Sequence, residues 1–330
     1  MTYALSPSVR TALRDSDRRI VMTGAGGWLG LATLELLSDA LGPALEARVV
    51  CFGASRRMLT LIDGREIEQH PLSDIAHLAP SPSLVLHLAF LTKDRAEEMD
   101  EADYRRANRG LSAQLLDSLD AIDARAVFVA SSGAARFADD PTRSVAMRLY
   151  GELKRADEEA FAAWAEARNR RAVITRLFNI AGPHTNKVRS YALSAFILDA
   201  LETGSVRVHA PHSVMRGYVA IRELMSLAFA LLLAETAGVV RFDSGGEAME
   251  LAAVAALVGE QLGASVERAP LTSMQADIYL GDAATYAGLL AAYDIESVTF
   301  AQQIAETRST LQPAVNHKMS DPAFGGSRPG

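Results

Sequence analysis

Residues 20–30 constrain the fold of this chain more than any other segment. A short apolar run at 20–23 leads into the sequence TGAGGWLG, and residues 29–40 continue with the apolar period of a helix. A strand, a glycine-rich turn and a helix start together form an anion site, because free N–H groups and the helix dipole point toward a bound phosphate. The pattern predicts dinucleotide binding, and a plain tight turn is the alternative. The residues assigned to this site are Gly24, Gly27, Trp28, Leu29 and Gly30.

Short apolar runs alternate with helical segments along the first 180 residues. Strands are predicted at 20–23, 48–52, 67–70, 84–90, 126–131 and 172–180, and helices at 29–40, 104–119 and 145–168. This alternation is typical of an α/β protein with a doubly wound parallel sheet, the Rossmann fold. We expect residues 1–182 to form mainly a dinucleotide-binding domain. Residues 183–312 are expected to form a smaller C-terminal α/β substrate-binding lobe, with some segments returning to the sheet, and 313–330 a disordered tail.

The end of the second predicted strand bears on the choice of dinucleotide. An acidic residue there would bind the ribose hydroxyls of NAD, whereas arginine can accommodate the 2′-phosphate of NADP. The strand is followed by Ser55, Arg56 and Arg57, with no carboxylate. We therefore expect NADP to be preferred over NAD, the alternative being that the two arginines are solvated surface charges.

The helix predicted at 145–168 carries Tyr150 and, four residues later, Lys154, which share one helix face. Lysines are scarce, with four among 33 basic residues, and a Tyr-x-x-x-Lys pair is expected by chance only about 0.1 times in such a chain. The ammonium and the positive nicotinamide would lower the tyrosine pKa. Such a tyrosine can exchange a proton with a carbinol while hydride moves to or from the nicotinamide. An incidental pair on a solvated face is the alternative.

Two serines, Ser131 and Ser132, close the strand predicted at 126–131, where sheet ends line the ligand crevice of such folds. A serine hydroxyl there could hydrogen-bond the reacting oxygen. The sequence leaves both candidates open, together with a plain strand-end turn.

In their order and spacing these segments resemble the extended short-chain dehydrogenases/reductases, specifically the NAD(P)-dependent epimerase/dehydratase family that acts on nucleotide sugars. The resemblance runs from about 20 to 311 and includes the glycine loop, the HLAF strand end, Tyr150 with Lys154, and the segments RLFNIAGP and RGYVAI. It implies that Ser132 is the third catalytic residue, that Asn179 contacts substrate and that Arg216 binds a diphosphate. It also implies a homodimer formed through the helices at 104–119 and 145–168. Further cofactor contacts implied are Leu72, Leu88, Ala89, Phe90 and Phe178.

One departure from the family pattern narrows the chemistry. Dehydratases of the family carry an Asp-Glu pair directly after the central hydroxyl residue, where this chain has Gly133, Ala134 and Ala135. Dehydration is therefore disfavoured. The expected activity is NADPH-dependent reduction of a 4-keto nucleotide sugar, with Tyr150 as the proton donor. The alternatives are a C4-type epimerase that retains its cofactor and a non-catalytic dinucleotide sensor.

Composition argues against several other classes of protein, namely nucleic-acid-binding, disulfide-bonded, metal-binding and membrane proteins. The net charge of −7 argues against a nucleic-acid-binding surface, and a single cysteine, Cys51, permits no intrachain disulfide and no multi-cysteine metal site. His209 and His212 lack partners at ligand spacing, so no metal is expected. The sequence has neither a signal-like start nor an apolar run long enough to span a membrane, which predicts a cytoplasmic protein without membrane partners.

Overall fold

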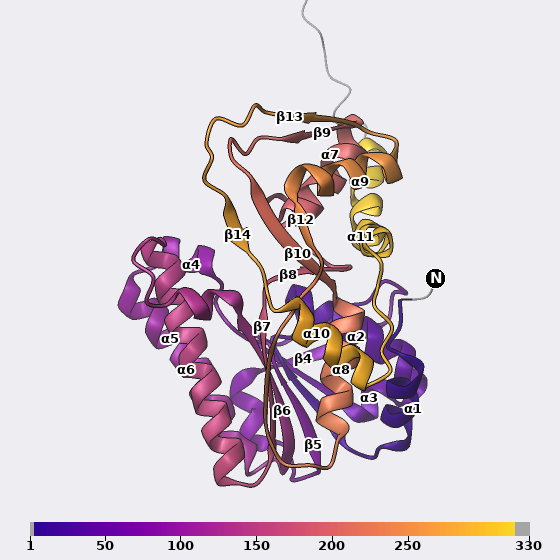
Figure 1. The fold of residues 1–330 in the computed structure, drawn as a ribbon. Coiled ribbons are helices and arrows are strands. Elements are labelled where there is room, and N and C mark those ends of the chain that lie inside the picture. Colours follow the sequence, from indigo (N-terminus) through magenta and orange to yellow (C-terminus); the bar gives the residue numbers. More distant parts are fainter. Residues whose placement is uncertain (1–2, 321–330) are drawn as a thin grey trace, which may run out of the picture.

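The computed structural model describes residues 3–320, and side chains up to residue 312. An eight-stranded sheet forms the centre of the larger part of the molecule (Figure 1). All neighbouring strands are parallel except β3 and β4, which form an antiparallel pair at one edge. In spatial order the strands are β11 (Gly238–Asp243), β7 (Arg171–Leu177), β6 (Ala124–Ser132), β5 (Ser83–His87), β1 (Arg19–Thr23), β2 (Val49–Gly53), β4 (Glu66–Pro71) and β3 (Arg57–Thr60).

Helices cover both faces of this sheet, which confirms the predicted doubly wound fold. One face carries α1 (Pro7–Asp15), α2 (Trp28–Leu41), α8 (Ile221–Leu233) and α10 (Ala283–Ala292). The other carries α5 (Glu101–Leu119) and α6 (Val145–Ala167). Successive residues of β1 alternate between the two cores: Ile20 and Met22 pack on the first side and Val21 on the second. The central strands are therefore apolar on both faces. Two short helices complete this part, α3 (Leu45–Arg48) and α4 (Lys93–Glu98).

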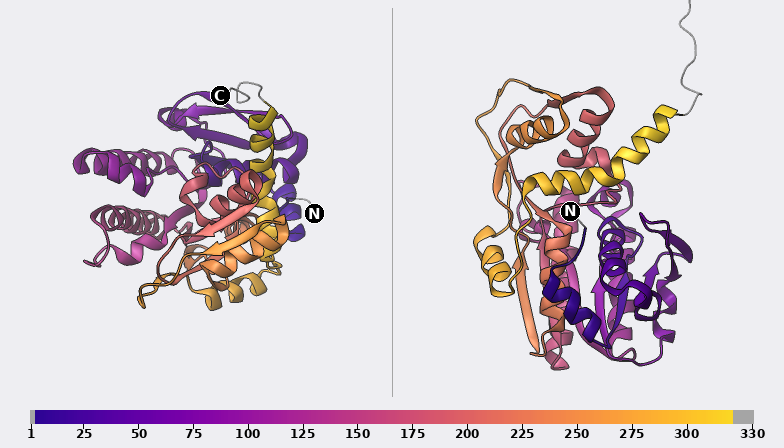
Figure 2. Two further views of the ribbon diagram at one scale, coloured as in Figure 1. Left: turned by 90° about the horizontal axis from the view of Figure 1, so that it is seen from above. Right: turned by 90° about the vertical axis from the view of Figure 1, so that its right-hand side faces the viewer.

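A smaller lobe lies above the large sheet in Figure 1. Its central strand, β10 (Val214–Ala220), pairs with β8 (Asn179–Ala181), β12 (Ala248–Glu250) and β14 (Asp277–Tyr279). A two-stranded ladder joins β9 (Ser205–Val208) to β13 (Ser265–Arg268). The lobe has its own apolar core, and Figure 2 shows its helices from two further sides. They are α7 (Ala192–Thr203), α9 (Leu251–Leu262) and α11 (Phe300–Ser320).

The structure corrects several predicted elements. The strand predicted at 172–180 is two strands, because the chain leaves the large sheet at Phe178, whose N–H donates to Ser244 Oγ at 2.9 Å, and enters the second sheet at Asn179. The strand predicted at 84–90 ends at His87. Helix α11 continues to Ser320, through residues predicted as tail, while 321–330 lie outside the described residues. The sequence did not reveal α1, α10, β3, β12, β13 or β14.

Among the described residues, no helix is long and apolar enough to cross a membrane.

Candidate active site

The candidate site is a cavity of about 1330 Å³ between the carboxyl ends of the large sheet and the smaller lobe. Its lining brings together the glycine loop, the end of β6, the start of α6 and the strands β8, β10 and β14. The predicted residues that line it are Gly24, Gly27, Trp28, Leu29, Gly30, Leu88, Phe90, Ser131, Ser132, Tyr150, Lys154, Phe178, Asn179 and Arg216.

The glycine loop has the shape that close approach of a pyrophosphate requires. Gly24 has φ +71°, and a Cβ there would lie 2.6 Å from the backbone N of Ala89. A Cβ on Gly30 would lie 2.4 Å from the carbonyl oxygen of Ala25. Helix α2 begins at Trp28 after Gly27, and no side chain caps its first turn. These N–H groups and the helix dipole fit a dinucleotide phosphate.

The predicted contacts at the adenosine end lie outside the cavity lining. Arg56 pairs with Glu68, and its Nη2 lies 3.6 Å from Asp74 Oδ2. Arg57 donates to the carbonyl of Gly26 at 3.2 Å, so its guanidinium lies against the glycine loop. Only Arg57 of the two arginines is therefore close to the loop. Leu72 is buried in the core beside α5, and Ala89 adjoins Gly24 without lining the cavity.

Gln69, on β4, is a residue that the sequence did not single out. Its Oε1 accepts from Gly26 N–H at 3.1 Å and its Nε2 donates to the Ser55 carbonyl at 2.8 Å. The side chain is buried directly over Gly53, where a Cβ would lie 2.4 Å from it. A neutral amide thus holds the end of β2 against the glycine loop. No motif marks this residue, because its role depends on the pairing of β4 with β2.

Lys154 is buried beside the cavity. Its Nζ donates to the Ala130 carbonyl at 2.7 Å and lies 3.7 Å from the ring centroid of Phe90. Burial lowers the pKa of Lys154 to about 8, while the charges of Asp157 and Glu158 act in the opposite direction. The ammonium is therefore the main form at neutral pH, held by a carbonyl and an aromatic face.

Tyr150 lines the cavity with its ring 5.7 Å from that of Phe90, edge to face. Its ring centroid is 6.0 Å from Lys154 Nζ. The sequence led us to expect a lowered tyrosine pKa. In the chain by itself the pKa of Tyr150 is instead raised, with burial as the main cause, and a hydrogen bond with Ser132 opposes the rise. The lowering expected from a nicotinamide charge is a separate effect of the bound cofactor.

The two serines at the end of β6 have different surroundings. Ser131 donates to Glu158 Oε1, and Glu158 in turn binds Arg176 through two hydrogen bonds of 2.8 and 2.7 Å. Ser132 instead accepts from Ala134 N–H at 3.2 Å, and its Oγ lies 3.5 Å from the Tyr279 hydroxyl. Of the alternatives that the sequence left open, Ser132 is the one whose hydroxyl faces other hydroxyls of the cavity.

The two predicted substrate contacts lie on adjacent strands of the lobe. Asn179 on β8 donates to the Gly217 carbonyl at 3.2 Å. Arg216 on β10 donates to Asp277 Oδ2 at 2.6 Å and to the Asp277 carbonyl at 3.0 Å. The pKa of Asp277 is lowered by its pairing with Arg216, although burial opposes this. The guanidinium predicted to bind a diphosphate thus already has a carboxylate partner.

Strand β14 brings two residues to the site that the sequence did not reveal. Asp277 and Tyr279 occupy alternate positions and reach Arg216 and Ser132, respectively. No sequence motif marks these two residues, because their place at the site depends on the pairing of β14 with β10.

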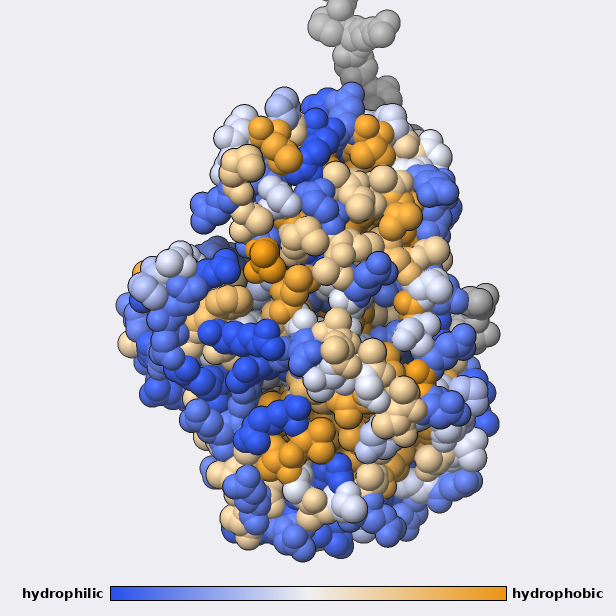
Figure 3. Space-filling model, in the orientation of Figure 1, coloured by the Kyte–Doolittle hydropathy of each residue, from blue (hydrophilic) through white to orange (hydrophobic). Residues whose placement is uncertain are grey.

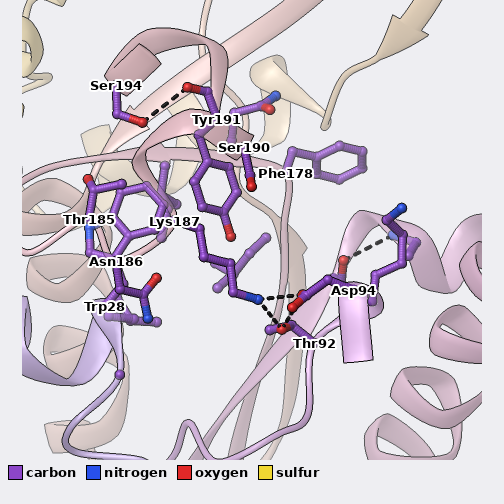
Figure 4. A pocket seen from close by; sticks show the side chains of 18 of the residues that line it. Trp28, Thr92, Asp94, Phe178, Thr185, Asn186, Lys187, Ser190, Tyr191 and Ser194 are labelled. Atoms are coloured by element: carbon purple, nitrogen blue, oxygen red, sulfur yellow. Dashed lines mark hydrogen bonds and ion pairs between the residues drawn. The ribbon is translucent and has the colours of Figure 1, made fainter. Parts of the chain in front are cut away.

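A strap formed by residues 184–191 crosses one side of the cavity (Figure 4). Lys187 extends from it to Asp94 and to Thr92 Oγ1, the latter at 2.5 Å. The ring of Tyr191 lies 5.0 Å from that of Trp28. Trp28 therefore joins the glycine loop to the strap. These contacts connect the smaller lobe to the loop before α4.

Comparisons with known proteins agree with this geometry. Residues 20–242 match the model of the NAD dependent epimerase/dehydratase family. MoeE5 in complex with UDP-glucuronic acid and NAD has a TM-score of 0.67 at 18% identity, over 90% of this chain and 99% of that one. The structure of a UDP-N-acetylglucosamine 4-epimerase from Methanobrevibacter ruminantium M1 has a TM-score of 0.69 at 18% identity. The match covers 92% of this chain and 99% of that one. The structure of the RMD protein from Pseudomonas aeruginosa complexed with NADPH has a TM-score of 0.65 at 18% identity. The match covers 89% of this chain and 100% of that one.

A comparison with curated protein sequences found no match. The structural likenesses, at low identity, establish the fold, and the family model covers more than half of the chain. The chain belongs to the NAD-dependent epimerase/dehydratase family.

Proposed function

We propose that this protein is an NAD(P)-dependent oxidoreductase that reduces a 4-keto nucleotide sugar. The observation that carries the proposal is the convergence of Ser132, Tyr150 and Lys154 on one cavity that also contains the glycine loop and Arg216. The solved structures with a similar fold include complexes with UDP-sugars. The segment after Ser132 consists of Gly133, Ala134 and Ala135, which carry no carboxyl group that could serve in dehydration.

In the proposed reaction the carbonyl oxygen of the sugar accepts hydrogen bonds from Ser132 and Tyr150. The bound cofactor would supply the hydride. Tyr150 donates its proton to the oxygen as negative charge develops there. The Lys154 ammonium, fixed between Ala130 and Phe90, stabilises the phenolate that remains. Asn179 and Arg216 would hold the rest of the substrate, with a diphosphate displacing Asp277 from Arg216.

The test is oxidation of NADPH in the presence of 4-keto UDP-, dTDP-, GDP- and CDP-sugars. Tyr150→Phe keeps the ring against Phe90 and removes the proton donor, so we expect kcat to fall by about 10²- to 10⁴-fold. Tyr293→Phe, away from the cavity lining, is the matched control and should leave kcat unchanged. Full turnover by Tyr150→Phe would overturn the mechanism, and no turnover of any sugar by the parent protein would overturn the substrate class.

A C4-type epimerase is the second candidate, and the strap is the observation that favours it. Lys187 bound to Asp94 and Thr92 covers one side of the cavity, as retention of a cofactor between two half-reactions would require. Purified protein that carries tightly bound nicotinamide cofactor, and interconverts two sugars without net oxidation of NADPH, would establish the epimerase. Release of free cofactor in each turnover would exclude it. The intact Tyr150 and Lys154 pair argues against a non-catalytic sensor.

We propose further that NADP(H) is preferred and that Arg57, rather than Arg56, binds the 2′-phosphate. Arg57 lies on the glycine loop, whereas Arg56 is paired with Glu68. Arg57→Gln should raise the Kd for NADPH at least tenfold and leave that for NADH nearly unchanged, because one charge-assisted contact to phosphate is lost. Arg56→Gln is the control and should leave both the Kd for NADPH and the Kd for NADH nearly unchanged. Tighter binding of NADH than of NADPH by the parent protein would contradict the preference.

A homodimer through α5 and α6 remains a proposal. Phe161 and Ala165 of α6 are buried in the core, whereas Ala163 and Ala167 of the same helix are exposed. The surface over α4 to α6, at the left of Figure 3, is largely hydrophilic. A dimer formed there would therefore rest on polar contacts, and sedimentation at several salt concentrations would test it.

A further inference from the structure

Tyr279 occupies a fixed position beside Ser132. It lies on β14, directly opposite Arg216 of β10 in the parallel ladder. Its ring centroid is 4.8 Å from that of Phe178 and 5.9 Å from that of Phe137, so two aromatic rings pack against it. The close-up of the cavity in Figure 4 shows Phe178 on the side away from Trp28. These contacts hold the Tyr279 hydroxyl 3.5 Å from Ser132 Oγ.

The hydrogen-bonding capacity of Ser132 explains why this position matters. A serine hydroxyl has two acceptor lone pairs and one hydrogen that rotates to suit its surroundings. Ala134 N–H occupies one lone pair at 3.2 Å. The Tyr279 hydroxyl lies 3.5 Å from Ser132 Oγ, and when it acts as the donor it occupies the other lone pair. Burial raises the pKa of Tyr279, which keeps the phenol protonated. With both lone pairs engaged, the hydrogen of Ser132 is directed toward Tyr150, its hydrogen-bond partner in the chain by itself, which is the side on which the proposed reacting oxygen would lie.

We propose that Tyr279 is a positioning residue: it fixes the hydroxyl of Ser132 so that its hydrogen is aimed at the reacting oxygen of the substrate. The inference rests on the proposed function, because it assigns Ser132 the role of donor to that oxygen. It accounts for a tyrosine hydroxyl that the proposed proton transfer by Tyr150 does not use. It also gives β14 a role in catalysis, although 147 positions separate Tyr279 from Ser132.

Tyr279→Phe tests the proposal, because it keeps the ring packed against Phe178 and Phe137 and removes only the hydroxyl. We expect kcat for sugar reduction to fall by about tenfold, because a rate change of that size corresponds to the free energy of one neutral hydrogen bond. KM should be nearly unchanged. In a Ser132→Ala background the same change should have no further effect, since the group that Tyr279 positions is gone. Tyr293→Phe again serves as the control for the chemical change.

A crystallographic measurement supplies a readout that needs no turnover. Ser132 should occupy one side-chain rotamer in the parent protein and more than one in Tyr279→Phe. An unchanged kcat, or effects of Tyr279→Phe and Ser132→Ala that multiply independently, would overturn the proposal. A raised KM with unchanged kcat would also overturn it, because Tyr279 would then contact substrate directly. If the parent protein reduces no nucleotide sugar, the proposed function fails, and the Ser132 rotamers alone decide whether Tyr279 fixes this hydroxyl.

Discussion

The buried ammonium of Lys154 predicts a specific pH dependence of stability. Its pKa is about 8 in the folded chain, against 10.5 for an unperturbed lysine, with burial as the main cause. Below pH 8 the side chain is protonated in both the folded and the unfolded state, so the destabilisation caused by burying the charge is fully present. Between pH 8 and 10.5 the unfolded state binds more protons than the folded state. Stability contributed by this group therefore rises with pH through that window, by about 3 kcal/mol in total.

Lys154→Met removes this titration while keeping an unbranched side chain of similar length. At pH 7 the two proteins should have similar free energies of unfolding. Methionine relieves the desolvation of the ammonium, but it leaves the Ala130 carbonyl without its donor, which costs about 1–3 kcal/mol. As the pH rises from 7 to 10.5, the parent protein should gain about 3 kcal/mol relative to the variant.

The assay is urea unfolding of the cofactor-free proteins, followed by circular dichroism at several pH values between 6.5 and 10.5. Tyrosines titrate in the same range, and those distant from Lys154 cancel in the difference. Tyr150, whose ring centroid is 6.0 Å from Lys154 Nζ, is removed from the comparison by measuring both proteins in a Tyr150→Phe background. Lys93→Met is the control, because Lys93 is partly exposed and pairs with Glu97 one helical turn later. If the free energy of unfolding changes with pH in the same way for Lys154→Met and the parent protein, the argument from burial is refuted.

Two further predictions concern the glycine loop and the strap. Gly24→Ala would place a Cβ 2.6 Å from Ala89 N at φ +71°, so we expect a loss of about 2 kcal/mol or more in urea unfolding and loss of NADPH binding by fluorescence titration. Gly110→Ala, with open space at its Cβ in α5, should instead stabilise by about 0.5–1 kcal/mol. Lys187→Met should expose residues 184–191 to faster limited proteolysis and speed the release of NADPH, because the contact with Asp94 is lost. If Lys187→Met and the parent protein are cleaved at the same rate and release NADPH at the same rate, the strap does not close the cavity.

Much of the cofactor side of the site could be predicted from the sequence, because its signals are short-range. A strand, four glycines and a helix start lie within eleven residues, and Tyr150 and Lys154 share a helix face through a spacing of four. The parallel sheet followed from the alternation of apolar runs and helical periods. Each of these features depends on backbone geometry within a few turns, which residue types by themselves largely determine.

Other features were decided only by tertiary structure. The difference between Ser131 and Ser132 depends on Glu158, which accepts a hydrogen bond from Ser131, whereas Ser132 Oγ lies 3.5 Å from the Tyr279 hydroxyl. Arg56 and Arg57 are equivalent in sequence, yet one pairs with Glu68 and the other lies on the glycine loop. Tyr279 reaches Ser132 because β14 pairs with β10, a contact between segments about 60 residues apart. Strand pairing of this kind is set by the packing of the whole lobe, so no local pattern can specify which side chains it brings together.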